Sequence, residues 1–178
     1  MVVETPGYAN LYRQLAFQGV QLLEVPRTRG GPDLPALEAL LQEHHPKCLF
    51  IHSLYHNPTG TSLCRVVAER LLELAHRENF LIIEEDVYGD LQQASCTRLS
   101  ALPHDDRVIY VASFSKTLSS ALRVGYLCAS SAIIAQLASL KTLTGFGTSR
   151  FAEAVVATLL VSTMRESRQV SALALRCG

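Results

Sequence analysis

Residues 47–86 read KCLFIHSLYHNPTGTSLCRVVAERLLELAHRENFLIIEED, and this stretch decides the fold. It opens with an apolar run, Lys47 to Ser53, which predicts a short buried strand. Ser62 is the expected N-cap of a helix whose apolar stripe lies opposite arginine and glutamate side chains; the stripe comprises Leu63, Val66, Val67, Leu71, Leu74 and Ala75. A second apolar run, Phe80 to Ile83, leads into three acids. The order strand, helix, strand predicts a parallel β-α-β unit.

The segments on either side continue this alternation. On the N-terminal side, residues 8–18 predict a helix that ends at Gly19, Val20 to Val25 predicts a strand that ends at Pro26, and Asp33 can cap a further helix. On the C-terminal side we expect strands at Val108 to Ala112 and Val124 to Ala129, and helices at Ile133 to Leu143 and Phe151 to Thr163. The predicted fold class is α/β, a three-layer α/β/α arrangement with a mostly parallel sheet.

The composition indicates a globular domain whose partner is a small molecule. The chain has 178 residues, 48% hydrophobic and 18% charged, which fits one domain with a substantial core. Sixteen basic and sixteen acidic side chains give a net charge of zero, so the charge favours neither nucleic acid nor an anionic membrane as a partner. The five cysteines are never spaced C-x-x-C, which argues against disulfides and a zinc site and suits a reducing cytoplasm. We expect neither a signal peptide nor a membrane span.

Polar residues gather after three of the predicted strands. The clusters are His52 to Gly60, Glu84 to Tyr88 and Ser113 to Arg123. In open α/β sheets, ligands bind outside the carboxyl ends of the strands. We therefore expect the three clusters to form one site.

Lys116 stands at the end of an apolar strand, among small hydroxylated residues. Partial desolvation of a lysine favours the neutral amine, which can attack an aldehyde and form a Schiff base. The alternative is an exposed lysine at a strand end, which is the commoner place for a lysine. Ser113, Ser115 and Arg123 favour the first interpretation, because hydroxyl groups and a guanidinium group suit a phosphate dianion.

The other two clusters allow several interpretations. Asn57 is either a turn residue or a donor to a phenolate oxygen, and Tyr88 is either a core tyrosine or part of the site. A solvated strand end, a magnesium site and the partner of a pyridinium nitrogen are all compatible with the acids Glu84, Glu85, Asp86 and Asp90. His52 and His56 have no evident third ligand, so no metal site is expected.

Several segments together resemble the class I/II pyridoxal-phosphate-dependent aminotransferases of fold type I. They are ETPGY (residues 4–8), NPTG (57–60), IIEEDVYGDL (82–91), SFSKTL (113–118) and RVGY (123–126). Their order and spacing are closest to the aminotransferase-like domains of MocR-type regulators of the GntR family and to 2-aminoadipate and kynurenine aminotransferases. The resemblance implies pyridoxal 5'-phosphate as the cofactor, and an amino acid and a 2-oxo acid as the substrates.

The resemblance also implies roles for individual residues. They are Lys116 for the Schiff base and proton transfer, Ser113, Ser115 and Arg123 for the phosphate, Tyr8 for stacking on the pyridine ring, and Asn57 and Tyr88 as donors to the phenolic oxygen. An acid would pair with the protonated ring nitrogen; strand register favours Glu85, whereas residue type favours Asp86. Both cannot point at the ring from a regular strand, because successive side chains face opposite ways.

By the same resemblance, residues 1–178 correspond to part of the large cofactor-binding domain, with the N-terminal phosphate loop and the C-terminal small domain outside this truncated stretch. We expect amino-group transfer through Lys116, impaired in this fragment, and a cytoplasmic homodimer for the full-length protein. The non-enzymatic alternative is the effector-binding domain of a MocR-type regulator, which changes shape without turnover. A second enzymatic alternative is the S-x-x-K pair of penicillin-binding proteins, formed by Ser113 and Lys116, but its companion motifs S-D-N and K-T-G are missing from the chain.

Overall fold

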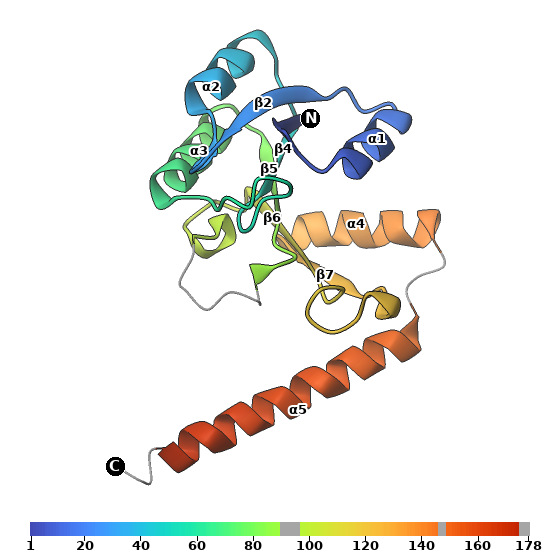
Figure 1. Ribbon diagram of the computed structural model, residues 1–178. Coiled ribbons are helices and arrows are strands. Elements are labelled where there is room, and N and C mark those ends of the chain that lie inside the picture. Colours follow the sequence, from blue (N-terminus) through green and yellow to red (C-terminus); the bar gives the residue numbers. More distant parts are fainter. Residues whose placement is uncertain (90–96, 146–148, 175–178) are drawn as a thin grey trace.

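The computed structural model describes residues 1–89, 97–145 and 149–174, and this part of the chain is built around a seven-stranded sheet (Figure 1). The strands are β1 (Val2–Thr5), β2 (Leu23–Thr28), β3 (Gly31–Pro32), β4 (Cys48–His52), β5 (Leu81–Glu85), β6 (Val108–Ser113) and β7 (Gly125–Cys128). Their order across the sheet is β3-β2-β1-β4-β5-β6-β7. Neighbouring strands from β2 to β6 run parallel, and the edge strands β3 and β7 run antiparallel to their neighbours. The predicted mostly parallel α/β sheet is confirmed.

Helices cover both faces of the sheet. They are α1 (Ala9–Phe17), α2 (Leu34–Glu43), α3 (Arg65–Arg77), α4 (Ser131–Thr144) and α5 (Arg150–Ala174), with short 3-10 helices η2 (Leu99–Ala101) and η3 (Ser120–Leu122). In Figure 1, α2 and α3 lie on one side of the sheet, and α1 and α4 lie on the other. Right-handed crossovers explain on which face α1, α2 and α3 lie. The connection from β1 to β2, which contains α1, runs along the sheet in one direction, and the connections to β4 and β5, which contain α2 and α3, run in the other. Helix α1 therefore lies on the opposite face from α2 and α3. The three-layer arrangement follows from this topology.

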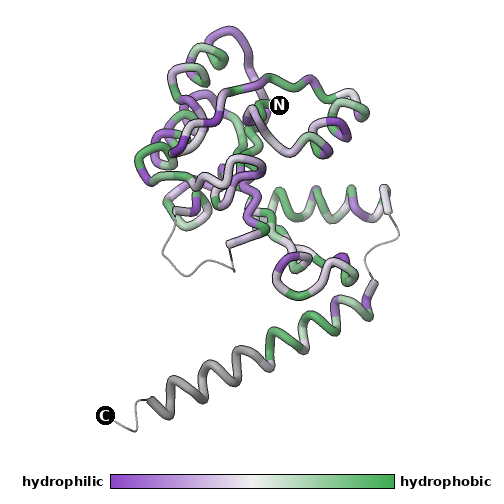
Figure 2. Tube along the Cα trace, in the orientation of Figure 1, coloured by the Kyte–Doolittle hydropathy of each residue, from purple (hydrophilic) through white to green (hydrophobic). Residues whose placement is uncertain are grey.

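The main hydrophobic core lies between the sheet and the pair α2 and α3. It contains Leu37 and Leu41 from α2 and Leu71 and Leu74 from α3, each at most 3% exposed. Val66, which was predicted to belong to the α3 stripe, is instead 74% exposed. Neither α1 nor α4 contains a buried residue, although Figure 2 colours much of α4 as hydrophobic. The strands are therefore anchored mainly from the face that α2 and α3 cover.

A membrane span is not found among the described helices. None of them combines the length and the apolar character that crossing a bilayer requires.

Strand β2 extends beyond the predicted stop at Pro26. It runs to Thr28, where Arg27 and Thr28 pair with the two residues of β3. Proline has no backbone N–H to donate to a neighbouring strand. The pairing of β2 with β3 begins at Arg27, so no hydrogen bond from Pro26 to β3 is needed. The extension matters because it carries Arg27 to the carboxyl edge of the sheet.

The two predicted helix caps have different outcomes. Asp33 caps α2 as predicted, with its carboxylate accepting a hydrogen bond from the Ala36 N–H at 3.0 Å. Cys64, rather than Ser62, occupies the N-cap position of α3, and its side chain makes no capping hydrogen bond. The Ser62 hydroxyl accepts a hydrogen bond from the Tyr55 N–H at 3.2 Å. Ser62 therefore stabilises the loop that precedes α3 and not the helix itself.

The strand order changes direction at β1, since β2 lies on one side of it and β4 on the other. A switch of this kind leaves a crevice at the carboxyl ends of the strands. Segments that follow β1, β4, β5 and β6 all emerge at this edge, which is where the sequence clusters are expected to meet.

Candidate functional site

A cavity of about 380 Å³ is formed at the carboxyl ends of the parallel strands. It is lined by Tyr8, His52, Asn57, Glu85, Val87, Tyr88, Ser113, Ser115, Lys116, Ser120 and Arg123. Eight of the nine residues predicted from the sequence are in this lining, and Asp86 is the ninth. The three polar clusters thus meet at one place, because parallel strands end at the same edge of the sheet.

The acids at the end of β5 point to alternate sides, as successive strand residues do. The Glu84 carboxylate is fully buried and accepts hydrogen bonds from the backbone N–H groups of Leu99 and Ser100, at 2.7 and 2.9 Å. Glu85, the next residue, lines the cavity. Glu84 therefore holds η2 against the sheet, while Glu85 presents its charge to the site.

Asp86 lies outside the cavity lining. Its buried carboxylate accepts hydrogen bonds from Arg98 Nε at 2.6 Å and from the Tyr110 hydroxyl at 2.9 Å. Burial and the neighbouring Asp86 carboxylate raise the pKa of Tyr110 well above its ordinary value, so the phenol stays protonated and donates. Of the two acids that the sequence left open, Glu85 is the one that the structure places at the cavity.

His52 is a cavity residue to which the sequence analysis assigned no role at this site. It ends β4 directly beside Glu85, its partner in the register of β4 and β5. Its Nε2 lies 2.5 Å from the Glu85 Oε2, and the residue is 3% exposed. The sequence places both residues at the ends of predicted strands, but their contact can be predicted only if the register of those two strands is known.

Hydroxyl groups form the wall around Lys116. The Ser113 Oγ donates to the Ser115 Oγ at 3.0 Å and accepts from the Ser115 N–H at 3.1 Å. Ser120, which belongs to the predicted cluster Ser113 to Arg123 but was given no individual role, adds a third serine hydroxyl, and the exposed Arg123 adds a positive charge. Lys116 is exposed rather than partly desolvated as expected. Its Nζ lies 5.9 Å from the centre of the Tyr88 ring.

The loop that carries Asn57 is held by its own backbone. The His56 N–H donates to the Thr61 carbonyl at 2.8 Å, and the Gly60 N–H donates to the His56 carbonyl at 2.6 Å. Gly60 has a φ of 69°, a left-handed conformation that glycine adopts without steric cost. Asn57 therefore projects from a closed loop, on the side that faces the cavity.

A buried polar cluster lies behind the cavity. Glu4 is 1% exposed and accepts a hydrogen bond from Arg27 at 2.6 Å; burial raises the pKa of Glu4, and Arg27 offsets part of this effect. Burial, Arg27 and His52 lower the pKa of His56 to about 4. Glu4, His52 and His56 could together offer three atoms to a metal ion, a third ligand that the sequence analysis had not found. However, the Arg27 guanidinium already neutralises Glu4 and would repel a divalent cation there.

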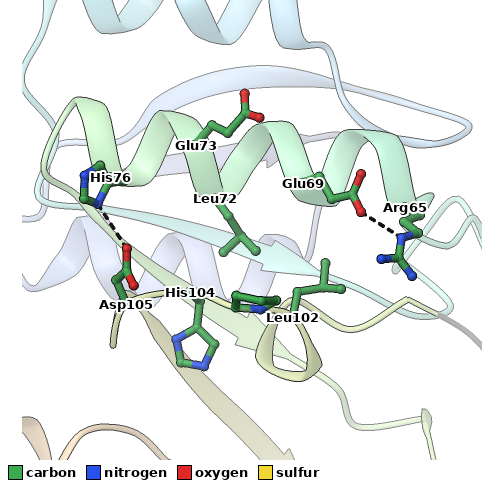
Figure 3. A pocket seen from close by; sticks show the side chains of 9 residues that line it. Arg65, Glu69, Leu72, Glu73, His76, Leu102, His104 and Asp105 are labelled. Carbon is green, nitrogen blue, oxygen red and sulfur yellow. Dashed lines mark hydrogen bonds and ion pairs between the residues drawn. The ribbon is translucent and has the colours of Figure 1, made fainter.

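Figure 3 shows a second cavity, of about 550 Å³, between α3 and residues 102–105. Charged side chains that line it pair as follows: Arg65 with Glu69 at 2.7 Å, His76 with Asp105 at 3.4 Å, and Glu73 with Arg70, which does not line the cavity, at 2.9 Å. None of the residues predicted from the sequence lines it. This second cavity therefore lacks the combination of a lysine, an arginine and serine hydroxyls that lines the first one.

Comparison with known proteins agrees with this geometry. Residues 1–176 match the family described as aminotransferase class I and II. The 2-aminoadipate transaminase of Thermus thermophilus is 33% identical over 134 residues, which cover 72% of this chain and 34% of that protein. The uncharacterized HTH-type transcriptional regulator YisV of Bacillus subtilis is 29% identical over 151 residues, which cover 84% of this chain and 31% of that protein. The chain thus spans about a third of the length of these relatives.

Solved structures share the fold. LysN, an alpha-aminoadipate aminotransferase from Thermus thermophilus, gives a TM-score of 0.83 at 29% identity, over 93% of this chain and 44% of that one, and was solved with N-(5'-phosphopyridoxyl)-L-leucine. The kynurenine aminotransferase of Pyrococcus horikoshii, solved in complex with PMP, gives a TM-score of 0.81 at 29% identity, over 86% of this chain and 40% of that one. On the match over residues 1–176, the chain belongs to the class I and II aminotransferase family.

Proposed function

We propose that the cavity binds pyridoxal 5'-phosphate and that the protein transfers an amino group between an amino acid and a 2-oxo acid. The observation that carries this proposal is the convergence of Lys116 with a carboxylate, three serine hydroxyls and a guanidinium group in one cavity. Family membership and the solved relatives that contain the cofactor in modified form support it.

The donor set fits the chemical groups of this cofactor one by one. Phosphate would be held by Ser113, Ser115, Ser120 and Arg123, the ring nitrogen by Glu85, the phenolic oxygen by Asn57 and Tyr88, the ring face by Tyr8 and the aldehyde by Lys116. When bound, the cofactor supplies an electron sink for the negative charge that develops at the α-carbon of the substrate.

The protein's own side chains would supply orientation and proton transfer. The Glu85 carboxylate would favour a positive charge on a ring nitrogen held beside it, and the imidazole of His52 lies against that carboxylate. The Nζ of Lys116 is the group that would move a proton to and from the α-carbon.

A regulatory role is the second candidate, because relatives such as YisV and YcxD of Bacillus subtilis are described as HTH-type transcriptional regulators. In that case the same cavity would bind the cofactor as an effector, without turnover. Transaminase activity and sequence-specific DNA binding, measured on the protein with its native flanking sequence, would distinguish the two roles.

We further propose that residues 1–178 form part of the large domain of a cytoplasmic homodimeric protein. The support is the similarity over about a third of the length of the relatives. Sedimentation of the protein with its native flanking sequence would test the dimer.

Borohydride reduction in the presence of pyridoxal 5'-phosphate, followed by peptide mapping, tests the proposed function. The chain contains three lysines, Lys47, Lys116 and Lys141, and peptide mapping distinguishes them from one another and from the N-terminal amine. We expect the label at Lys116, its loss in Lys116→Ala, and its retention in the control Lys141→Ala. Label at either of the other lysines, or at none, would refute the proposal.

A further inference from the structure

Arg27 lies directly behind the cavity, although it does not line it. Its side chain is 0% exposed, and its guanidinium group donates hydrogen bonds to Glu4, His52 and Thr61. These partners belong to three different segments, the end of β1, the end of β4 and the return of the Asn57 loop. One buried side chain therefore ties together the segments that form the back of the site.

The first set of contacts fixes His52. Arg27 donates to the His52 carbonyl at 3.0 Å and to the Glu4 Oε1 at 2.6 Å. The Glu4 Oε2 in turn accepts from the His52 N–H at 3.2 Å. Both backbone polar groups of His52 are thus bound by one ion pair, which orients the imidazole that contacts Glu85.

The second set of contacts fixes the loop that carries Asn57. Arg27 Nε donates to the Thr61 Oγ1 at 3.1 Å, and a terminal nitrogen donates to the Thr61 carbonyl at 3.4 Å. That carbonyl also accepts the His56 N–H, and the Thr59 hydroxyl joins the Thr61 hydroxyl to the His56 ring at 2.9 Å on each side. Asn57 lies between His56 and Thr59 in the chain, so its position depends on these hydrogen bonds.

We propose that Arg27 is a positioning residue that sets Glu85, through His52, and Asn57, through Thr61, at a fixed separation. This inference rests on the proposed function, in which these two side chains hold the ring nitrogen and the phenolic oxygen of one planar ring. A guanidinium group suits this task because its donors form a rigid planar fork, which an ammonium group lacks. Glu4 makes the arrangement possible by neutralising the buried positive charge.

Two variants of Arg27 and one control test the proposal. Arg27→Lys keeps the charge opposite Glu4 but loses the planar fork. The double variant Glu4→Gln/Arg27→Met removes both charges, so neither is left buried without a partner. Arg70→Met is the matched control, because Arg70 lies on α3, pairs with Glu38 and Glu73, and is 38% exposed.

The measurements are urea unfolding, the affinity for pyridoxal 5'-phosphate and the pH midpoint at which the visible band of the bound cofactor changes. We expect Arg27→Lys and the double variant, under conditions where each is folded, to bind about tenfold more weakly. Their pH midpoints should shift, since moving any charged or titratable group of the cavity changes the electrostatic field at the proposed ring; these groups are Tyr8, His52, Glu85, Tyr88, Lys116 and Arg123. Arg70→Met should match the wild type in affinity and midpoint.

Thr61→Val extends the test to a variant with a near-isosteric change. It removes one acceptor of Arg27 from the Asn57 side only, so we expect weaker binding with a smaller shift of the midpoint. Wild-type affinity and midpoint in folded Arg27→Lys, or in Thr61→Val if the Arg27 variants do not fold, would overturn the proposal. Failure to label Lys116 in the wild type would instead refute the proposed function, and this inference with it.

Discussion

Acid should destabilise the fold through His56, whose ring is buried behind the cavity. Burial, the charge of Arg27 and the nearby His52 lower the pKa of His56 from 6.5 to about 4, whereas in the unfolded chain the ring takes up its proton near the ordinary pKa. The stability gained by keeping the ring neutral is complete above pH 6.5 and is lost as the pH falls towards 4. At about 1.4 kcal/mol per pH unit, the free energy of unfolding should fall by about 3 kcal/mol across this window.

Urea unfolding of the wild type and His56→Gln at about pH 7 and about pH 4.5 measures this effect. Glutamine does not titrate, and its amide can replace the hydrogen bond between the His56 Nδ1 and the Thr59 hydroxyl. The free-energy difference between the two proteins should change by about 2 to 3 kcal/mol over this range, in favour of the variant at low pH. Acids that do not contact His56 are present in both proteins and largely cancel.

His45→Gln is the control, because His45 is exposed. Its free-energy difference from the wild type should stay constant with pH. If the difference for His56→Gln also stays constant, the ring is not kept neutral by burial and the reasoning fails.

Further variants test the core, a helix cap and the acidic segment. Leu71→Ala leaves a cavity at a fully buried position and should lower the free energy of unfolding, measured in urea, by about 2–5 kcal/mol; a loss below about 1 kcal/mol would contradict the packing. Asp33→Ala removes the cap of α2 and should cost about 1 kcal/mol in the same assay, whereas Asp33→Asn should cost less. In absorbance titrations with pyridoxal 5'-phosphate, Glu85→Gln should bind more weakly, while Asp86→Asn should mainly lower stability; equal loss of binding in both would contradict the separate placement of the two carboxylates.

The sheet could be predicted because its signals are local and repeated. The stripe of α3 and the apolar runs on either side of it define a β-α-β unit, and the parallel arrangement then brings the segments after β4, β5 and β6 to one edge. Lys116, Asn57 and Tyr88 could be grouped on this basis without knowledge of any contact. The grouping is correct because it depends on topology, which tolerates errors of a residue or two in each strand.

Features that depend on single-residue register or on tertiary contacts could not be predicted. To choose between Glu85 and Asp86, one must know which face of the sheet the last residue of β5 points to. To predict the contact of His52 with Glu85, one must know the register in which β4 and β5 pair. Ser62 has the side chain of a good cap but bonds to Tyr55 instead, because the loop before α3 closes on itself. Arg27 showed no signal, since its partners lie 23, 25 and 34 residues away in the chain.

The surroundings of the buried acids explain why Glu85 is the one that presents its charge to the cavity. Glu4 is neutralised by a buried arginine, Glu84 binds two backbone N–H groups, and Asp86 binds an arginine and a tyrosine. Glu85 instead faces the imidazole of His52, which neutralises it only when protonated. A shift of one residue at the end of β5 would turn Glu85 towards η2 and Asp86 or Glu84 towards the cavity, and would separate each acid from its donors. The hydrogen bonds that hold the carboxylates of Glu84 and Asp86 therefore also fix the orientation of Glu85. They thereby fix the position of the carboxylate that a cationic ring nitrogen would face.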